Sequence, residues 1–349
     1  MKEIKDFLEV KEEDFNEEAL KVFNFQYANN KVYKEYVDAL DIKPEEVDKI
    51  EQIPFLPVRL FKTKRIITYS QSRDLEPEKI FTSSSTTGMT PSKHFVMDLE
   101  MYRKSFINSF EYFYGKIEGA AVLALLPSYL EREGSSLIYM VDEFIKSSKN
   151  PDSGYYLYNH EDLYQKLIKL KQEGRKTILF GVTFALLDFA EKFSLEENDW
   201  ELLIFETGGM KGRRKEISRD ELHKTLKKAF NVKNIHSEYG MCELLSQAYS
   251  KGQGIFNTPP WMKIVLRDIN DPLSLKTYNG KQIEDQKINM NKDSSGNITG
   301  VINIIDLANL YSCAFISTDD KGTILSDGSF TIDGRLSNAE RRGCNMLIE

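Results

Sequence analysis

Apolar side chains recur at helical spacing along the first 50 residues. A helix that packs against a core carries apolar residues every three or four positions, on one face. Pro44, followed by two glutamates, suits a helix start, because the missing N–H is harmless there and acidic groups favour the positive end of the helix dipole. We therefore expect a helical region over residues 1–55. The positions with this spacing are Phe15, Leu20, Phe23, Phe25, Tyr27, Tyr33, Tyr36, Val37 and Leu40.

Residues 53–66 have a different pattern and read IPFLPVRLFKTKRI. Two prolines lie among the apolar residues. Proline disrupts a helix interior and restricts the residue before it to extended backbone. We expect an extended segment that runs across a surface.

From about residue 95, helical patterns alternate with short apolar runs. Asp98 can cap a helix that ends near Gly115, and acidic residues open a second helix that ends near Gly174. Short apolar runs between helices are typical of buried strands, and their alternation predicts a parallel sheet covered by helices. The apolar runs are 120–128, 176–182, 200–209 and 233–240, and the helical segments are 99–115, 160–174 and 218–230.

After residue 255 the pattern changes to short strands separated by turn residues. Such a pattern is typical of antiparallel hairpins and predicts a β-rich subdomain. The turn signals are Asn279-Gly280, Gly296, Gly322 and Asp327-Gly328.

The composition is typical of a globular protein. Of the 349 residues, 41% are apolar and 29% charged. No apolar run approaches the roughly 20 residues that a bilayer span requires. The N-terminal sequence lacks the apolar core of a secretory signal. We expect no membrane span and a cytoplasmic location.

The cysteines and the net charge exclude further classes. Cys242, Cys313 and Cys344 are too widely spaced for a disulfide framework or a structural zinc site, so we expect reduced thiols, with Cys313 in a core strand. The formal charge of −7 disfavours a nucleic-acid partner, because phosphate backbones are held by an excess of lysine and arginine. The basic run at 211–215 is too short to change this expectation.

The first candidate for chemistry is the hydroxyl-rich stretch FTSSSTTGMTPSKH, residues 81–94. It is not a Walker A loop, which requires GxxxxGK[ST]. Hydroxyl groups, a glycine and a nearby lysine suit another kind of phosphate-binding loop. A flexible linker is equally compatible with the composition, and His94 suits either a gate to a substrate pocket or a surface position. The candidate ligands are Ser83, Ser84, Ser85, Thr86, Thr87, Gly88 and Lys93.

The second candidate is HSEYGMCE, residues 236–243. A carboxylate beyond a strand end can hold Mg²⁺ together with substrate phosphates, because this ion prefers one or two carboxylates plus phosphate. We assign that role to Glu243. Tyr239 can stack on a base, and Gly240 and Cys242 lie in the same turn. A strand end with solvated glutamates and Cys242 in the core is the alternative.

Two further turns complete the set. Gly208 and Gly209, followed by Met210, come after a buried strand and allow main chain to approach a flat ligand. Asp319 can accept hydrogen bonds from ribose hydroxyls, and Arg335 can add a charged fork. A tight turn and an ordinary polar hairpin are the alternatives.

In order and spacing, these four motifs resemble those of the adenylate-forming enzymes, which include acyl-CoA synthetases, luciferases and peptide-synthetase adenylation domains. SSSTTGMTPSK resembles their phosphate loop, with Ser85 where a glycine is usual, and YGMCE resembles YG-x-TE, with Cys242 where a threonine is usual. Ser317-Thr318-Asp319 resembles TGD, and GRLSN from Gly334 resembles the GR-x-DD hinge.

The resemblance implies the α/β fold of the superfamily's N-terminal domain, with helix-covered mixed β-sheets and a smaller β-rich subdomain. It places the adenylate-forming core over 56–334, and a hinge-like segment with a mobile tail over 335–349, without the usual C-terminal domain. It implies ATP and Mg²⁺ as cofactors. The superfamily's C-terminal domain supplies a lysine that assists adenylation, and Lys93, a tail arginine or a partner protein is a candidate to replace it.

A narrower resemblance is to the acyl-protein synthetases of bacterial bioluminescence operons and their relatives. It rests on IPFLPVRLFKTK, the serine-rich loop and the tail RGCNMLIE. It implies a ligase that activates a carboxylic acid, expected to be a fatty acid, as an acyl-adenylate. The acyl group then moves to Cys344 and from there to a reductase partner. Arg341 and Arg342 can lower the pKa of that thiol.

Three alternatives stay open from the sequence. Cys344 is also compatible with an incidental thiol on a frayed terminus. An acyl-CoA ligase would use coenzyme A as acceptor and leave this cysteine unused. A non-catalytic acyl-binding subunit would keep the fold without the chemistry.

Overall fold

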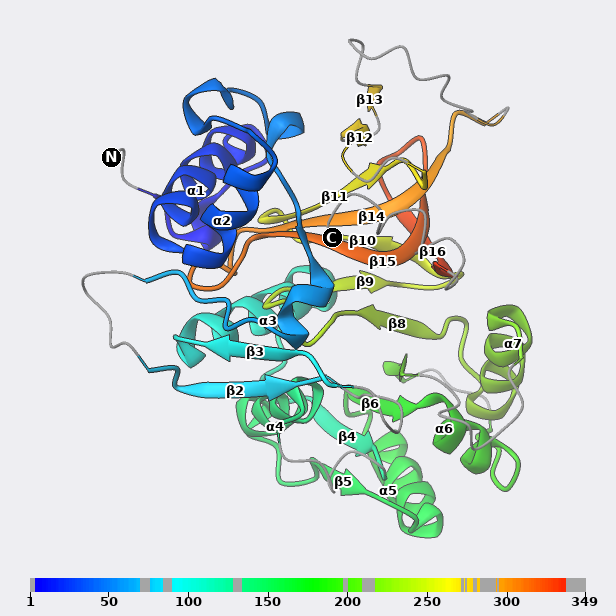
Figure 1. Ribbon diagram of the computed structural model, residues 1–349. Coiled ribbons are helices and arrows are strands. Elements are labelled where there is room, and N and C mark those ends of the chain that lie inside the picture. The colour runs from blue at the N-terminus through cyan, green and yellow to red at the C-terminus, as the bar shows by residue number, and fades with distance from the viewer. Residues whose placement is uncertain are drawn as a thin grey trace. The chain divides into compact units, whose positions relative to one another are not determined.

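The computed structural model describes residues 4–69, 76–83, 90–127, 134–196, 200–208, 217–270, 273, 275–278, 281–282, 293 and 295–336. The chain forms two compact units, and Figure 1 labels many of their helices and strands. The first unit contains Met1–Phe106, Met241–Ser246 and Asn257–Glu349, and the second contains Ile107–Gly240 and Gln247–Phe256.

The N-terminal region of the first unit is helical, as its apolar spacing predicts. Asn30 separates two helices and caps the second, because its side chain accepts a hydrogen bond from the Tyr33 N–H at 3.0 Å. Phe23 and Tyr33 contact Phe315, with ring centroids 6.4 and 6.1 Å apart, so these helices pack on the first unit's sheet. The helices are α1 (Phe15–Asn29), α2 (Lys31–Ala39), η1 (Phe7–Glu9), η2 (Pro44–Glu46) and η3 (Ile50–Gln52).

The expectation of an extended chain over residues 53–66 was wrong in part. Leu56–Pro57 forms the short strand β1, but Val58–Lys62 forms a 3₁₀-helix, η4. Pro57 is the N-cap of η4, so both prolines precede the helix, where they break no helical hydrogen bond. The turn places the side chain of Phe61 in the core, where it is buried.

An antiparallel sheet forms the rest of the first unit, as the turn signals beyond residue 255 predict. Its strand order is β13-β12-β11-β14-β15-β16, and β1 pairs with β15 in parallel. A separate hairpin pairs β2 with β3. The strands are β2 (Lys79–Thr82), β3 (Lys93–Val96), β11 (Met262–Arg267), β12 (Leu275–Tyr278), β13 (Lys281–Gln282), β14 (Ile298–Asp306), β15 (Phe315–Ile324) and β16 (Phe330–Arg335).

The predicted turns of this sheet were right in two places and wrong in one. Gly296 and Gly328 adopt positive φ angles of 81° and 88° in turns. Gly322 lies inside β15, opposite Ile332, where a Cβ would collide with the Thr331 carbonyl oxygen. A close approach of two strands, and not a turn, therefore requires glycine here. The signal at 279–280 lies outside the described residues.

The second unit contains the predicted parallel sheet. β5, β4, β6, β7 and β8 are parallel neighbours in this order, and β9 pairs with β8 in the antiparallel sense. Helices α4 and α6 were not expected. The strands are β4 (Ala121–Leu125), β5 (Gly154–Tyr156), β6 (Thr177–Val182), β7 (Leu202–Thr207), β8 (His236–Tyr239), β9 (Ala248–Ser250) and β10 (Ile255–Asn257), and the helices α3 (Leu99–Tyr114), α4 (Ser136–Ser148), α5 (His160–Gln172), α6 (Thr183–Ala190) and α7 (Arg219–Phe230).

Aromatic side chains form the core on one face of this sheet. Phe180 on β6 stacks on Phe205 on β7, with ring centroids 4.8 Å apart. Phe110 of α3 and Phe144 of α4 contact Phe180 at 6.4 and 5.6 Å. Helix α6 lies against the other face, where a Cβ at Gly181 would collide with a side chain of α6. Helices therefore cover both faces, as a parallel sheet requires.

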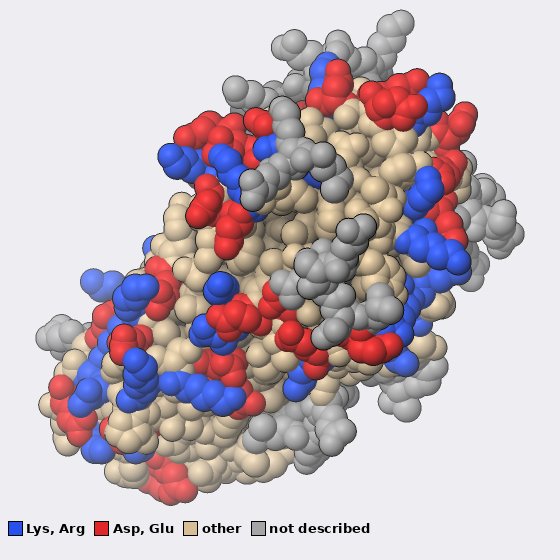
Figure 2. Space-filling view, turned by 90° about the vertical axis from the view of Figure 1, so that its left-hand side faces the viewer, with Lys and Arg blue, Asp and Glu red and all other residues tan. Residues whose placement is uncertain are grey.

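Acidic and basic side chains are mixed over the face shown in Figure 2. Ion pairs of this kind include Lys149–Glu118 at 2.8 Å and Lys43–Glu46 at 3.1 Å. Exposed pairs of this type each contribute about 0–1 kcal/mol. Across the described helices, none has the length and apolar character that a bilayer crossing demands.

We expect Phe180→Ala to lower the free energy of unfolding by about 3–5 kcal/mol, because it removes a fully buried ring from the aromatic core. Urea unfolding followed by circular dichroism measures the loss. Tyr158→Ala is the control, since this ring is 63% exposed, and should change the value by less than about 0.5 kcal/mol. Equal effects of the two substitutions would contradict the assignment of Phe180 to the core.

Candidate active site

The carboxyl group of Glu243 lies buried in the first unit, with 5% of the residue exposed. Burial raises its pKa, while a hydrogen bond from the Ser92 side chain and the positive charges of Arg335 and Lys62 oppose that shift. Two residues singled out in the sequence, Glu243 and Arg335, are therefore brought close enough to interact. Ser92 and Lys62 were not expected in the site.

Ser92 also closes the hydroxyl-rich loop. The Ser92 N–H donates to Ser83 Oγ at 2.9 Å, and the Ser83 N–H donates to the Ser92 carbonyl oxygen at 3.1 Å. This pair extends the β2–β3 hairpin, in which Thr82 lies opposite Lys93, whose side chain is exposed. The loop thus leaves the hairpin and returns to it beside Glu243. Its central residues, Ser84, Ser85, Thr86, Thr87 and Gly88, lie outside the described residues.

Buried polar side chains hold the chain that carries Glu243. The Asp306 carboxylate accepts hydrogen bonds from the N–H groups of Leu245 and Ser246, at 2.9 and 3.0 Å, and from Ser246 Oγ at 2.6 Å. Trp261 Nε1 donates to the same hydroxyl at 3.0 Å. Burial raises the pKa of Asp306, and the hydrogen bonds it accepts oppose the shift.

His94 is part of this buried network and is not a surface residue. It is 1% exposed, with Nδ1 2.8 Å from the Cys242 carbonyl oxygen and Nε2 3.2 Å from Asn309 Oδ1. Asn309 Nδ2 donates to the Glu243 carbonyl oxygen at 2.7 Å. Burial lowers the pKa of His94 to about 4, so the ring is neutral at pH 7. No periodic pattern in the sequence indicates these contacts.

The cysteines within the described residues are buried in different degrees. Cys313 is fully buried, as predicted, and burial raises its pKa to about 12. Cys242 is partly exposed, and burial together with the neighbouring Glu243 carboxylate raises its pKa well above the ordinary value. Neither thiol is therefore a reactive thiolate at pH 7. Cys344 lies outside the described residues.

Arg335 pairs with Asp320. Its Nε lies 2.9 Å from Asp320 Oδ1, and the two residues are opposite each other in the β15–β16 ladder. The Arg335 side chain is 73% exposed. Asp319 is partly exposed, and its carbonyl oxygen accepts the Leu336 N–H at 2.8 Å. The ribose role of Asp319 stays a prediction.

The remaining described candidates belong to the second unit. Gly208 follows β7 with a positive φ of 77°, and Tyr239 ends β8, with its ring 6.1 Å from that of Phe256. Gly240 is exposed, and a Cβ there would collide with Glu238 Oε1. Gly209 and Met210 lie outside the described residues. The YGMCE motif thus contributes Tyr239 and Gly240 to one unit and its last three residues to the other.

A second acidic cluster at the carboxyl ends of β7 and β8 was missed in the sequence. Glu206 accepts a hydrogen bond from Ser237 Oγ at 2.8 Å and lies 3.7 Å from His223 Nε2. Burial would raise the pKa of Glu206, but the contacts with His223 and Ser237 outweigh burial and lower it. Burial, with Glu206 beside it, raises the pKa of Glu238 to about 7, against a hydrogen bond from Thr207.

The residues around Glu243 fit Mg²⁺ that arrives with substrate phosphates. Mg²⁺ is usually bound by one or two carboxylates plus phosphate oxygens and water. Among the described residues, no three histidine, cysteine or acidic side chains converge as a ready metal cage. Glu243, with the Ser92 hydroxyl beside it, supplies one carboxylate and therefore suits an ion shared with a nucleotide.

The family described as "Acyl-protein synthetase, LuxE" matches residues 6–109. The match confirms the resemblance to acyl-protein synthetases for the part of the chain that contains Ser92 and His94. No curated protein sequence matches the chain.

The fold is that of the adenylate-forming enzymes, as the four motifs predict. An open form of 2-hydroxyisobutyryl-CoA ligase, in complex with 2-HIB-AMP and CoA, is similar with a TM-score of 0.59 and 13% identity over 93% of this chain and 70% of that one. A luciferase-like enzyme from the mealworm Zophobas morio gives a TM-score of 0.50 and 13% identity over 78% of this chain and 60% of that one.

A third similar structure is the O-succinylbenzoate coenzyme A synthetase of Bacillus subtilis, in complex with AMP. It gives a TM-score of 0.48 and 15% identity, over 73% of this chain and 49% of that one. The chain therefore spans about half the length of that synthetase.

Glu238 gives a pH-dependent prediction. In the folded protein the Glu238 carboxyl group binds a proton more tightly than in the unfolded chain, because its pKa is about 7 instead of 4.5. Stability of the folded state is therefore lost as the pH rises from 4.5 to 7. Glu238→Gln removes this loss. We expect the variant to gain up to about 3 kcal/mol over the wild type between pH 4.5 and pH 7, at 1.36 kcal/mol per pKa unit.

Urea unfolding at a series of pH values measures this difference. Glu196→Gln is the control, because Glu196 is an exposed glutamate of the same unit, and its difference from the wild type should not vary with pH. Parallel pH profiles for Glu238→Gln and the wild type would contradict a raised pKa.

Proposed function

We propose that this protein activates a carboxylic acid with ATP as an acyl-adenylate and then holds the acyl group on Cys344 as a thioester for a partner protein. The family match over residues 6–109 and the adenylate-forming fold support a ligase of this kind. The similar 2-hydroxyisobutyryl-CoA ligase contains 2-HIB-AMP, a product of the same class. A fatty acid as substrate and an acyl reductase as partner are further parts of the proposal.

The observation that carries the proposal is the position of Ser92. Its main chain closes the hydroxyl-rich loop against Ser83, and its side chain lies close enough to the carboxyl group of Glu243 to oppose the rise of its pKa. Ser92 and Glu243 lie 151 positions apart in the sequence, so two distant motifs meet at one residue. An adenylating site needs hydrogen-bond donors for the substrate phosphates close to a carboxylate that can hold Mg²⁺.

In the first step an oxygen of the substrate carboxylate attacks the α-phosphorus of ATP. The bond between that phosphorus and the bridging oxygen breaks, and pyrophosphate leaves. Mg²⁺, when bound, neutralises phosphate charge. Lys62 and Arg335 create a positive field beside Glu243 that favours the same phosphates, and Lys93 presents an exposed ammonium at the end of the loop. Ser92 orients the Glu243 carboxylate.

In the second step the Cys344 thiolate attacks the acyl carbonyl, and AMP leaves with the bonding electron pair. The sequence places Arg341 and Arg342 beside this cysteine, and their charges favour the thiolate. Cys242 and Cys313 are poorer candidates for the acyl-accepting thiol, because burial raises the pKa of both.

Two further residues are assigned to nucleotide binding in the first step. Tyr239 stacks on the adenine, and Asp319 holds the ribose.

ATP–pyrophosphate exchange tests the adenylation step. Across a panel of carboxylic acids, at least one acid should support exchange, and Glu243→Gln should reduce its rate by about 100-fold or more, because the substitution removes the carboxylate that holds the ion. Glu45→Gln, at an exposed position of the same unit, should leave the rate unchanged. Wild-type protein without acid-dependent exchange, with and without a reductase present, would contradict the proposal and favour an acyl-binding subunit.

Intact-protein mass spectrometry tests the second step. We expect the mass of one acyl group to appear on the wild type after incubation with ATP and the acid. The Cys344→Ser variant should lose this adduct while keeping pyrophosphate exchange. Exchange without any adduct on the wild type, together with acyl-CoA formation when coenzyme A is added, would instead identify an acyl-CoA ligase.

A further inference from the structure

The segment that carries Glu243 lies between regular elements. Residues 241–246 contain neither helix nor strand, so their buried peptide groups must find partners elsewhere. The Cys242 carbonyl oxygen accepts a hydrogen bond from His94 Nδ1 at 2.8 Å, and the Glu243 carbonyl oxygen accepts one from Asn309 Nδ2 at 2.7 Å. Two side chains thus hold two successive carbonyls.

These carbonyls belong to the two peptide groups on either side of the Glu243 Cα. Each peptide group is planar, so fixing both planes fixes the φ and ψ angles between them. The backbone angles set the direction of the Cα–Cβ bond. Holding the Cys242 and Glu243 carbonyls therefore determines where the Glu243 carboxyl group can lie.

Hydrogen-bonding capacity determines which atom donates. A carbonyl oxygen only accepts, so His94 must carry its proton on Nδ1. Asn309 must direct its NH₂ group to the Glu243 carbonyl, which places Oδ1 toward His94 Nε2 at 3.2 Å. The neutral ring has one proton, and the shorter contact, to Cys242, holds it, so the Nε2 lone pair faces Asn309 Oδ1 without a hydrogen bond. The geometry assigns one tautomer to His94.

Both donors are themselves fixed. His94 lies on β3 opposite Phe81, with the ring of Phe61 edge-on at 5.9 Å. Asn309 is fully buried, and its carbonyl oxygen accepts Gln26 Nε2 of α1 at 3.0 Å. Neither donor can turn away without losing a buried contact.

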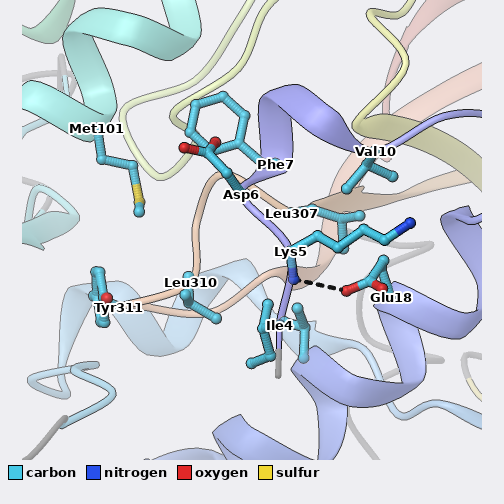
Figure 3. Close-up of a pocket in the computed structure, with 11 residues that line it drawn as sticks. Ile4, Lys5, Asp6, Phe7, Val10, Glu18, Met101, Leu307, Leu310 and Tyr311 are labelled. Carbon is cyan, nitrogen blue, oxygen red and sulfur yellow. Dashed lines mark hydrogen bonds between the residues drawn. The ribbon is translucent and has the colours of Figure 1, made fainter. Parts of the chain in front are cut away.

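Asn309 lies in the loop of residues 307–314 between β14 and β15, and another side of this loop faces a pocket of about 180 Å³ (Figure 3). Leu307, Leu310 and Tyr311 line this pocket together with Met101 and residues of the N-terminal segment and α1. Asn309 is directed to Glu243 instead. A substitution at Leu310 therefore changes the loop without removing a hydrogen bond to the segment 241–246.

We propose that His94 and Asn309 are positioning residues that clamp the backbone of Glu243 and so hold its carboxyl group for the nucleotide-bound cation. The role rests on the proposed adenylation. It adds two residues that act through Glu243 and touch neither substrate nor ion. It also explains why a histidine directly after the hydroxyl-rich loop is buried.

The test compares two substitutions of His94. In His94→Asn, the side-chain nitrogen is bonded to Cγ, as Nδ1 is, so the donor to Cys242 is kept. In His94→Gln, the nitrogen lies one bond farther out, near the position of Nε2. We expect His94→Gln to raise the Mg²⁺ concentration for half-maximal pyrophosphate exchange by about 10-fold or more. In His94→Asn this concentration should stay close to that of the wild type. The KM for the acid should stay unchanged.

Leu310→Ala is the matched control in the same loop. It should lower the urea midpoint, because it removes a side chain from the pocket wall, while the Mg²⁺ dependence of exchange stays that of the wild type. Equal Mg²⁺ shifts for His94→Gln and His94→Asn, or a shift for Leu310→Ala as large as that for His94→Gln, would overturn the proposal.

A second readout does not depend on activity. The chain has four histidines, so ¹⁵N-labelled histidine gives few ring signals, and the one lost in His94→Asn identifies His94. We expect a neutral ring with its proton on Nδ1, in slow exchange with water. A proton on Nε2 would overturn the clamp even in an active enzyme. If the proton lies on Nδ1 but the protein shows no ATP–pyrophosphate exchange, the clamp stands and only the proposed function is contradicted.

Discussion

The first unit depends on how a buried loop satisfies its backbone. Residues 307–314 connect β14 to β15 without regular structure, and an unpaired buried peptide group costs about 1–3 kcal/mol. Gln26 Nε2 donates to the carbonyls of Asn309 and Leu310 at 3.0 and 2.9 Å, while Gln26 Oε1 accepts the Ala314 N–H at 2.9 Å. Asn30 donates to the Ser312 carbonyl at 2.9 Å. Two amide side chains of the N-terminal helices therefore fix the loop.

The fixed loop in turn supports the candidate site. Asp306, the last residue of β14, and Asn309, in the loop, accept or donate four of the hydrogen bonds that hold residues 243–246. The order of support runs from the N-terminal helices to the loop, and from the loop to Glu243. The family match over residues 6–109 covers Gln26, Asn30 and His94, the residues that brace the site from the N-terminal side. Glu243 itself lies beyond that match.

The sequence predicted what depends on periodicity and missed what depends on long-range polar contacts. The parallel strands β4, β6 and β7 are continuous apolar runs, and caps such as Asp98, which accepts the Met101 N–H at 2.8 Å, mark helix starts. β2 and β3 have four residues each, too few for a period to show. His94 and Asn309 lie 215 residues apart, and single polar residues form no pattern that could join them. The motifs located Glu243, but only the fold shows what holds it.

Trp261 gives the site a built-in optical reporter. The chain has two tryptophans, and the other, Trp200, belongs to the second unit. The indole N–H of Trp261 bonds to Ser246, which Asp306 holds at the end of the segment that carries Glu243. The emission wavelength of an indole depends on the polarity and hydrogen bonding of its surroundings. Rearrangements of this segment are therefore open to observation in unlabelled protein, by fluorescence alone.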